Sequence, residues 1–509
     1  MSSTETADVI VVGGGAAGLA AAIEAASAGA SVILLEKATQ FRGTTGLSIG
    51  SISSSCTPEQ KRLGIVDSPQ EHFEDMAKFA GAYADRDNVE LARIIAECMP
   101  ETMRWLRQLG LEFYGPIEEP PHRKPRMHLV LPNSGAYIHY LLRRARALGV
   151  CVRLAIRAQR LVFNGRSVTG VEAERDAERI VFSARRGVVL AGGDFSNNPD
   201  FKREFRSEEF ADIPAWNELS TGDCQRMARE IGAVVVNSDY LLRPNLRFLP
   251  PPNDSLLRRL PANRLLTTPM RWALQYLPGW LIRPFALGSV TVGLGPERAL
   301  FEQGALLVDK RGKLIRRPGE DVGFAIAQQA KEGAYIVFDK SLFERFSKWP
   351  HFLSTAPGVA YAYMQDYRRH RRDIYAEAAD LSALATMLGM EAAQLGDAVR
   401  EHNAIISTSP VAQSANACPI LVAPFVALGP VRAWILFTNS GLKVSPSMQV
   451  LRSDSSVIHG LYAAGSSGQG GLLLAGHGHH LAWAFTSGRI AGRHAASMAS
   501  SDWANWSPA

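Results

Sequence analysis

A short apolar run opens the chain and sets the pattern of its first forty residues. Residues 8–12 end in four β-branched side chains, as expected for a buried parallel strand. Glycines follow at once, and the alanine-rich residues 19–28 favour a helix that ends at Gly29. Residues 31–35 form a second apolar run, which ends in Glu36. This order of strand, glycine turn, helix and strand predicts a βαβ unit.

The glycines of the first turn have the spacing that a bound dinucleotide requires. Gly13 permits a tight turn, Gly15 has no Cβ to obstruct a pyrophosphate, and Gly18 lets helix and strand pack closely. The start of the helix offers unpaired N–H groups to phosphate oxygens. Glu36 can accept hydrogen bonds from ribose hydroxyls. We therefore predict a dinucleotide site; a glycine-rich turn in some other α/β unit is the alternative.

Composition narrows the class of protein. The 509 residues are 46% hydrophobic and 20% charged, which excludes a disordered chain and indicates several domains. A net charge of +6 is small for this length and is weak evidence for nucleic acid. The five cysteines include no CxxC pair, which argues against a disulfide framework, a zinc knuckle and a redox dithiol. With no signal peptide and no run of about 18 apolar residues, a cytoplasmic location is expected.

A second glycine-rich segment favours a flavin over a nicotinamide cofactor. Residues 42–50 are small and hydroxyl-rich, so this loop can follow a dinucleotide and bring hydroxyls to a flavin ring. With it, the chain resembles the flavoproteins of the fumarate reductase / succinate dehydrogenase / 3-ketosteroid dehydrogenase superfamily. The matching stretches are residues 8–37, 43–50, 187–195, 221–233, 460–465 and 488–492. The resemblance covers both ends of the chain and is weak between residues 245 and 425.

This resemblance implies an α/β fold in which a Rossmann-like FAD-binding domain of the glutathione-reductase type is split by an inserted α+β cap domain. We expect the FAD-binding domain at residues 1–275 and 436–509, and the cap at 276–435. The implied cofactor is noncovalent FAD, because residues 41–49 contain no histidine or cysteine that could tether it. The implied FAD contacts are Gly13, Gly15, Ala16, Ala17, Gly18, Glu36, Lys37, Gly43, Thr44, Thr45, Gly46, Ser48, Gly50, Ala158, Ala191, Gly192, Gly193, Asp223, Gly465, His480 and Leu481.

The ionic groups of a fumarate reductase site are replaced in this sequence. The arginine that clamps the dicarboxylate corresponds to Ala475, the histidine of the cap junction to Phe437, and the proton-donor arginine falls near Val322. A dianion in a dry site without its arginine would cost several kcal/mol. Succinate and fumarate are therefore not expected as substrates.

The C-terminal glycine turn fits the 3-ketosteroid dehydrogenases better. The resemblance gives Gly478 the backbone N–H that holds the ketone oxygen, and it makes Tyr114 a hydroxyl of the pocket. A glycine at a helix start suits this role, because its N–H can stabilise developing enolate charge. Two tyrosines of that family are missing: the base of the cap falls near Phe324, and the tyrosine before the glycines is Leu474.

Histidines of the same turn are the candidates for proton transfer. His477, His479 and His480 would lie at the flavin edge, and an imidazole near neutral pKa could move the proton that accompanies hydride transfer. The alternative is a structural histidine at a helix start, and no metal site is expected. For Tyr114 and His128, which lie in a proline-rich stretch, the alternative is a surface loop.

Two further stretches allow a peripheral membrane contact. Residues 270–285 hold tryptophans, a tyrosine and a phenylalanine between prolines, and could line a substrate entrance or touch a bilayer; a place in the cap core is the alternative. Residues 367–372 are strongly basic, for which a solvated helix face is the default and an anionic-lipid contact the alternative.

These features together predict a FAD-dependent oxidoreductase that acts on a C–C bond next to a carbonyl. The favoured reaction is desaturation of an apolar, cyclic or steroid-like ketone, with hydride passing to flavin N5. A reductase of the fumarate reductase type on a less charged enone, and a flavin-holding module without turnover, are the alternatives. No second GxGxxG follows a strand, so an external electron acceptor or donor is expected.

Overall fold

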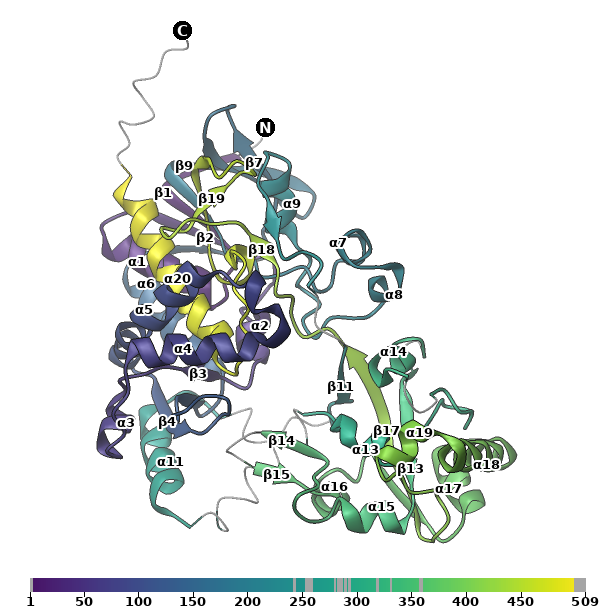
Figure 1. Cartoon of the computed structure of the whole chain (residues 1–509). Coiled ribbons are helices and arrows are strands. Elements are labelled where there is room, and N and C mark those ends of the chain that lie inside the picture. The colour runs from purple at the N-terminus through teal and green to yellow at the C-terminus, as the bar shows by residue number, and fades with distance from the viewer. Residues whose placement is uncertain are drawn as a thin grey trace.

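The computed structural model describes residues 3–240, 244–251, 260–278, 281, 287, 291, 294–316, 320–329, 332–356 and 360–498. These residues form two bodies that differ in their place along the chain (Figure 1). The larger body contains both ends of the described chain, and the smaller one is built from the middle. Each body has a hydrophobic core of its own, which agrees with an inserted unit.

The larger body is built on a mostly parallel sheet with the order β19-β20-β9-β1-β2-β6, to which β8 and β7 are attached beside β9. The predicted strands 8–12 and 31–35 are its centre, and they pair in parallel from Val9 with Val32 to Val12 with Leu35. The sheet strands are β1 (Ser3–Val12), β2 (Val32–Leu35), β6 (Cys151–Arg153), β7 (Arg157–Phe163), β8 (Val168–Arg175), β9 (Glu178–Leu190), β19 (Gln449–Leu451) and β20 (Val457–Ala463).

Strand β1 begins earlier than the hydrophobic pattern predicts. Its polar first half pairs with β9, from Ser3 opposite Ile180 to Ala7 opposite Ala184, and a register shift separates this part from Val9. The first part of the long strand β9 pairs antiparallel with β8 along one edge. Its other edge is free to pair with the polar first half of β1. Polar residues can join such an extension because backbone pairing, not burial, holds them.

Helices α1 (Ala16–Ser27) and α20 (His479–Ser497) pack closely against each other beside this sheet. Glycines permit the approach: a Cβ at Gly488 would lie 2.3 Å from the carbonyl oxygen of Ala17, and one at Gly492 would lie 2.2 Å from that of Ala21. Because the two helices start at the turns that carry the predicted site, this packing fixes those turns relative to each other.

A small antiparallel sheet with the order β3-β5-β4 lies beside the start of α20, which contacts β3. Its strands are β3 (Ser51–Ser53), β4 (Glu112–Ile117) and β5 (Met127–Leu131), and two further short strands are β10 (Val235–Val236) and β18 (Gly441–Leu442). The other helices of the larger body are α2 (Gly43–Leu47), α3 (Pro58–Arg62), α4 (Pro69–Ala80), η1 (Gly81–Arg86), α5 (Val89–Gln108), α6 (Gly135–Ala147), α7 (Pro199–Phe205), α8 (Glu208–Ala211), α9 (Asp223–Arg229), α11 (Arg264–Tyr276) and η3 (Gly465–Gly468).

The smaller body has a sheet of the order β11-β17-β13-β12, with β16 also paired to β17. A strand precedes the turn at residues 311–313, and a helix pair follows residue 380. Its strands are β11 (Asn245–Phe248), β12 (Leu306–Val308), β13 (Ala334–Phe338), β14 (Ser354–Ala356), β15 (Ala360–Ala362), β16 (Tyr375–Ala378) and β17 (Phe425–Trp434). Its helices are α13 (Arg298–Glu302), α14 (Val322–Ala327), α15 (Lys340–Arg345), α16 (Met364–His370), α17 (Leu381–Leu388), α18 (Ala392–Thr408) and α19 (Pro410–Ser414).

The chain crosses between the bodies more often than a single insert from 276 to 435 requires. β11 already pairs with β17 of the smaller body, whereas α11, which follows it, contacts β4 of the larger body. We therefore propose that the cap begins near residue 244, that α11 is an excursion back to the FAD-binding domain, and that the cap ends near residue 434.

The two stretches considered for a membrane contact fold differently from each other. In α11, Trp272 and Tyr276 are 58% and 62% exposed, so they do not belong to a cap core; residues 279–280 and 282–286 lie outside the described residues. In the basic stretch, Tyr367 is buried and the buried Arg371 donates to the carbonyls of Leu249 and Thr291, so this run is not one solvated face. No helix within the described part of the chain is long and apolar enough to cross a membrane.

Candidate active site

A cleft of about 870 Å³ lies at the carboxyl ends of β1, β2 and β9, where the first glycine turn meets the start of α1. This is the edge of a parallel sheet at which ligands of doubly wound folds bind. Predicted cofactor residues that line the cleft are Gly13, Gly15, Ala16, Ala17, Glu36, Lys37, Gly43, Thr44, Thr45, Ala158, Ala191, Gly192, Gly193, Asp223 and Gly465. The sequence thus predicts most of one continuous surface, although its members are spread over most of the chain.

The glycine turn has the shape that its spacing predicts. Gly13 has a positive φ of 104°, and a Cβ there would lie 2.4 Å from the carbonyl oxygen of Ala191. A Cβ at Gly18 would lie 1.8 Å from the carbonyl oxygen of Gly13, so only glycine allows this contact between helix and strand. A Cβ at Gly15, by contrast, would meet only the Thr45 hydroxyl, at 3.6 Å, which leaves this face of the turn open to the cleft.

Glu36 is fixed at the end of β2 by two backbone amides. Its Oε2 accepts a hydrogen bond from Gly14 N at 2.8 Å, and its Oε1 accepts one from Ala38 N at 2.9 Å. A carboxylate oxygen has room for more than one donor, so Glu36 keeps acceptor capacity for ribose hydroxyls. At the start of α1, the Thr45 hydroxyl accepts from Ala16 N at 3.0 Å, and the N-cap Gly15 offers no side-chain acceptor. The open turn, the carboxylate and this helix start together fit a dinucleotide.

Lys37 and Asp223 form an ion pair at the side of the cleft, with 2.9 Å between Lys37 Nζ and Asp223 Oδ2. Burial alone would raise the pKa of Asp223, but hydrogen bonds from Arg157 and Lys37 outweigh it and lower the pKa. Asp223 is therefore a carboxylate at neutral pH, and it holds the lysine beside the cleft.

Six predicted cofactor contacts lie outside the lining of this cleft: Gly18, Gly46, Ser48, Gly50, His480 and Leu481. Within the hydroxyl-rich loop, the Ser48 hydroxyl donates to the carbonyl of Thr45 at 2.8 Å and accepts from Gly50 N, so it shapes the loop. Lining residues that the prediction omitted are Val12, Gly14, Leu35, Ile156, Asn217, Leu219, Cys224, Ala464, Ser466 and Ala484. Gly14 could have been included from its place within the turn.

The second glycine turn, residues 475–480, leads into α20 and is pinned to β3. Gly478 is the N-cap of α20 with a positive φ of 84°, and a Cβ there would lie 2.6–2.7 Å from the backbone of Ile52 and Ser53. The Ser53 hydroxyl donates to the carbonyl of His477 at 2.7 Å. A side chain at position 478 would therefore disturb this packing as well as any oxyanion contact of its N–H.

His477 is held by a buried carboxylate. Its ring Nδ1 lies 2.5 Å from Glu119 Oε1, and its backbone N–H donates to the same oxygen at 2.8 Å. The side chain of His477 is 45% exposed, whereas that of Glu119 is 5% exposed. Since a carboxylate accepts, Nδ1 is the protonated ring nitrogen in the neutral imidazole and Nε2 is the free base. Glu119 is absent from the sequence prediction.

His479 faces away from this pair into a buried cluster with His72 and His122. Its Nε2 lies 3.4 Å from Nε2 of His72, and its ring centroid lies 5.2 Å from that of His122. Burial lowers the pKa of His72 to about 3 and that of His122 to about 4; burial also lowers the pKa of His479, with His72 and His122 adding to the effect. All three imidazoles are therefore neutral at pH 7.

The three imidazoles are close enough to share a metal ion, since their ligand atoms lie within 4.8 Å of one another. His122, however, already uses one ring nitrogen: Arg126 must donate to its Nδ1, at 3.1 Å, because a guanidinium cannot accept. A neutral His122 then carries its proton on Nε2, the other atom that could bind a metal. A metal on Nε2 of His122 would require the ring proton on Nδ1, where Arg126 donates, so this ring is a poor metal ligand; its Nε2 has no hydrogen-bond partner among the described residues.

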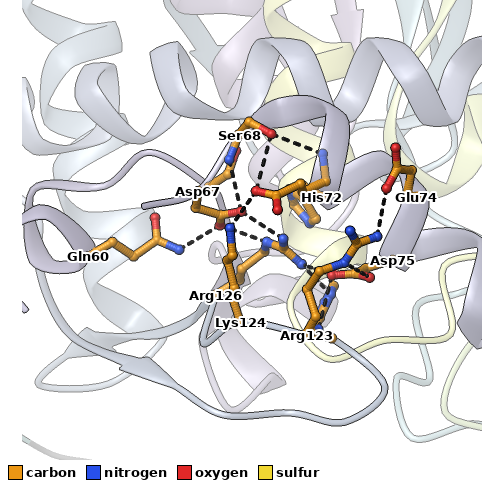
Figure 2. A network of polar contacts seen from close by, with 12 residues as sticks. Gln60, Asp67, Ser68, His72, Glu74, Asp75, Arg123, Lys124 and Arg126 are labelled. Carbon is orange, nitrogen blue, oxygen red and sulfur yellow. Dashed lines mark hydrogen bonds and ion pairs between the residues drawn. The ribbon is translucent and has the colours of Figure 1, made fainter. Parts of the chain in front are cut away.

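A network of charged side chains lies beside this histidine cluster (Figure 2). Arg126 donates to Asp67 at 2.7 and 2.8 Å and to Asp75 at 2.5 Å, and all three side chains are fully buried. Arg123 pairs with Asp75 and Glu74 at the edge of the network. The loop between β4 and β5 thus anchors itself through Arg126 and carries Glu119 and His122 to the turn before α20.

Two of the positions expected to lack ionic groups belong to the segment 475–480 or contact it. Phe437 lies just after β17, where the chain returns to the larger body. Its ring centroid lies 4.0 Å from that of His480. Ala475 is exposed two residues before His477. Burial lowers the pKa of His480 to about 4, so it is a neutral group beside Phe437. At the two positions that the resemblance assigns to a dicarboxylate clamp, this chain therefore has an apolar ring and an alanine.

The remaining candidates lie elsewhere or have structural partners. Tyr114 lies in β4 and His128 lies fully buried in β5, so the surface-loop alternative is wrong for both; burial lowers the pKa of His128 to about 3. β5 separates β4 from β3, which places the Tyr114 backbone about 10 Å from β3. Val322 is buried in α14, and Phe324 of the same helix packs on Phe210 of α8, joining the two bodies.

Comparison with known proteins places this chain in a family. The FAD binding domain family model matches residues 8–251 and 266–475. Urocanate reductase of Eggerthella lenta is 28% identical over 97% of this chain and 75% of its own length.

Two solved structures are similar in fold. The open conformation of a flavocytochrome c3 fumarate reductase superposes with a TM-score of 0.72, at 24% identity over 97% of this chain and 78% of that one. A 3-ketosteroid-Δ4-(5α)-dehydrogenase of Rhodococcus jostii RHA1 gives 0.59, at 24% identity over 97% of both chains. This chain belongs to the FAD binding domain family, within the fumarate reductase and succinate dehydrogenase superfamily; it is a FAD-dependent oxidoreductase.

Proposed function

We propose that this enzyme reduces a carbon–carbon double bond conjugated to a single carbonyl-type group, on a substrate that is not a dicarboxylate. Bound FAD supplies the hydride chemistry at the cleft edge. The proposal rests on the ring of Phe437, which packs 4.0 Å from that of His480, and on the exposed alanine at position 475, which offers no cation. The reductase direction is supported by the 28% identity to a urocanate reductase along almost the whole chain.

The charge of the turn argues against two substrate carboxylates. Ala475 offers no guanidinium, Phe437 offers no imidazole, and the neighbouring His479 and His480 are neutral at pH 7 because burial lowers their pKa values. A second carboxylate placed here would lose its hydration without gaining a guanidinium, at a cost of several kcal/mol. A single polarised oxygen is a better match.

The residues of this chain then divide the work as follows. The N–H of Gly478, at the start of a 19-residue helix, is placed to donate to the substrate oxygen as negative charge develops on it. The half-buried Phe437 supplies apolar surface for the rest of the substrate, and closure of the cap would exclude water. The part of the cofactor that lies far from the reacting bond is bound by Lys37, Glu36 and the first glycine turn.

The reverse reaction, desaturation of a saturated cyclic or steroid-like ketone, is the second candidate. Its support is the Gly-x-Gly pattern at the start of α20 with Gly478 as the N-cap, which resembles the 3-ketosteroid dehydrogenases. The same residues serve both directions, because oxidation and reduction of one bond share a transition state. The cellular electron partner decides the direction.

A substrate panel with two dyes tests this proposal. Purified holoenzyme is supplied with reduced viologen and cyclic enones, cinnamate-type monocarboxylates or fumarate, and separately with an oxidising dye and the saturated counterparts. We expect turnover of enones or monocarboxylates and none of fumarate or succinate. Turnover confined to the dicarboxylates contradicts the proposal. Failure of every compound to react, with FAD fully bound, indicates a flavin-holding module without turnover.

A further inference from the structure

We propose that His477 is the acid–base residue of this reaction and that Glu119 positions it. In the reducing direction the protonated imidazole gives the proton from its Nε2 to the carbon next to the carbonyl. In the oxidising direction neutral Nε2 takes that proton. The inference rests on the proposed function, because it assigns the proton that must accompany hydride transfer at the same bond.

The geometry of the pair is that of an oriented imidazole. Glu119 Oε1 accepts from both the ring Nδ1 and the backbone N–H of His477, at 2.5 and 2.8 Å, so the ring cannot rotate without losing a charged hydrogen bond. The carboxylate is 5% exposed, and its Oε2 is buried without a hydrogen-bond partner among the described residues. A buried carboxylate with one oxygen committed to the ring fixes the tautomer and stabilises the imidazolium that forms when Nε2 takes a proton.

The other face of the ring is open. His477 is 45% exposed, and no hydrogen bond of its Nε2 is recorded among the residues that the structure describes. Its neighbours on either side are Gly476 and Gly478, and Ala475 lies just before them, so no bulky side chain of the turn screens it. The next residue, Gly478, provides the N–H assigned to the substrate oxygen, which places the proton-transfer group and the oxyanion donor on adjacent residues.

The other histidines of the turn do not have this combination. His479 is buried against His72 and His122, and His480 is packed on Phe437. The two cap positions at which the resemblance expects the acid or base are apolar: Val322 is buried, and Phe324 packs on Phe210. His477 is thus the histidine of this turn that combines exposure with a carboxylate partner, and it lies on the FAD-binding domain rather than on the cap.

The proton and electron balance is closed by components already named. In reduction, His477 Nε2 gives a proton to the carbon next to the carbonyl and regains one from water, and bound FAD in its reduced form would supply the hydride for the other carbon. In oxidation, Nε2 takes the proton and passes it to water, and bound FAD in its oxidised form would accept the hydride. Glu119 remains a carboxylate throughout.

Exchange of the α-proton tests the assignment without net turnover. Oxidised holoenzyme is incubated in D₂O with the saturated product of the best substrate and no electron acceptor, and incorporation of deuterium next to the carbonyl is followed by NMR. We expect His477→Gln to lower the exchange rate by about 10²–10⁴-fold. Glu119→Gln, which keeps the shape but not the charge, should lower it by at least about tenfold while substrate binding is little changed. Exogenous imidazole should restore part of the exchange in His477→Gly.

Two controls separate proton transfer from folding. His494→Ala alters an exposed histidine in the last turn of α20, the helix that follows His477. This variant should leave exchange and turnover unchanged. In ¹⁵N-histidine-labelled protein, the His477 signals should show a proton on Nδ1 in the wild type, with the low-field shift of a short hydrogen bond that Glu119→Gln reduces.

The outcomes separate this proposal from the proposed function. Wild type that reacts with the panel while His477→Gln retains full exchange overturns the assignment alone. Loss of exchange in His477→Gly without any rescue by imidazole, together with a lowered melting temperature, also overturns it, because the residue would then be structural. Wild type that neither exchanges nor turns over any panel member overturns both.

Discussion

Arg126 is the centre of the charged network that anchors the loop carrying Glu119, and replacing it by leucine should destabilise the FAD-binding domain severely. Its guanidinium donates to Asp67 and Asp75, and the three side chains are fully buried (Figure 2). Asp75 keeps Lys78 and Arg123 as partners in the variant, but Asp67 keeps only Gln60 and the Ser68 amide. One buried carboxylate is then left without a cation.

The expected magnitude follows from that unpaired charge. Breaking a buried ion pair by removing one partner costs about 3–5 kcal/mol. The matched control is Arg123→Leu, because Arg123 also pairs with Asp75 but is 38% exposed, and a pair of this kind contributes about 0–1 kcal/mol. The Arg126→Leu penalty should fall when Asp67→Asn is added, since the second change removes the uncompensated charge.

Urea unfolding followed by circular dichroism, with flavin release as a second probe, measures these differences at pH 7. The pH dependence has a definite sign. Burial alone would raise the pKa of Asp67, but Arg126 outweighs it, and the pKa values of Asp67 and Asp75 are both lowered. The network therefore stabilises the fold fully above the ordinary carboxyl pKa near 4 and loses its effect as the pH falls below it. An Arg126→Leu variant no less stable than Arg123→Leu at pH 7 would refute this reasoning.

Three further predictions concern the cofactor and the substrate. Glu36→Gln should weaken FAD binding by about 10–100-fold in equilibrium dialysis, because charge-assisted hydrogen bonds of about 1.5–3 kcal/mol are weakened. The control is Glu90→Gln, which alters an exposed residue in the first turn of α5. Unchanged FAD affinity in Glu36→Gln would contradict the ribose role of this carboxylate. Acid precipitation should release all the flavin into the supernatant, since residues 41–49 contain no histidine or cysteine; flavin absorbance in the washed pellet would show a covalent bond. Fumarate and succinate should neither turn over nor perturb the flavin spectrum at millimolar concentration, because Ala475 and Phe437 occupy the ionic positions; turnover at about 1–1000 per second would show that these positions are wrongly assigned.

The cofactor cleft was predictable because its chemistry is local in sequence. Gly13 and Gly18 are sterically required to be glycine, because a Cβ would lie 2.4 Å from a backbone oxygen at Gly13 and 1.8 Å from one at Gly18, whereas Gly15 leaves the turn open to the cleft. Glu36 follows from the end of the second strand. The hydroxyl-rich loop was placed correctly as a segment, although Ser48 turned out to shape the loop instead of lining the cleft.

The surroundings of the turn at residues 475–480 were less predictable because its contacts are distant in sequence. Glu119 meets His477 across 358 residues, and His72 meets His479 across 407. Nothing in the spacing of either partner indicates the pairing, since it depends on the loop before β5 being anchored by Arg126. The boundaries of the cap were also obscured, because β11 joins a sheet whose central strand lies far along the chain.

Re-oxidation of reduced flavin in a single turnover tests directly whether the enzyme reduces a double bond that is conjugated to a single carbonyl-type group. Holoenzyme is photoreduced without oxygen and mixed in a stopped-flow instrument with a cyclic enone, a monocarboxylate such as cinnamate, or fumarate, while flavin absorbance is recorded. With an enone or a monocarboxylate, we expect rapid return of the oxidised flavin spectrum and formation of one equivalent of saturated product. With fumarate, we expect no change in flavin absorbance. Rapid re-oxidation by fumarate, with none by the singly activated compounds, would contradict it.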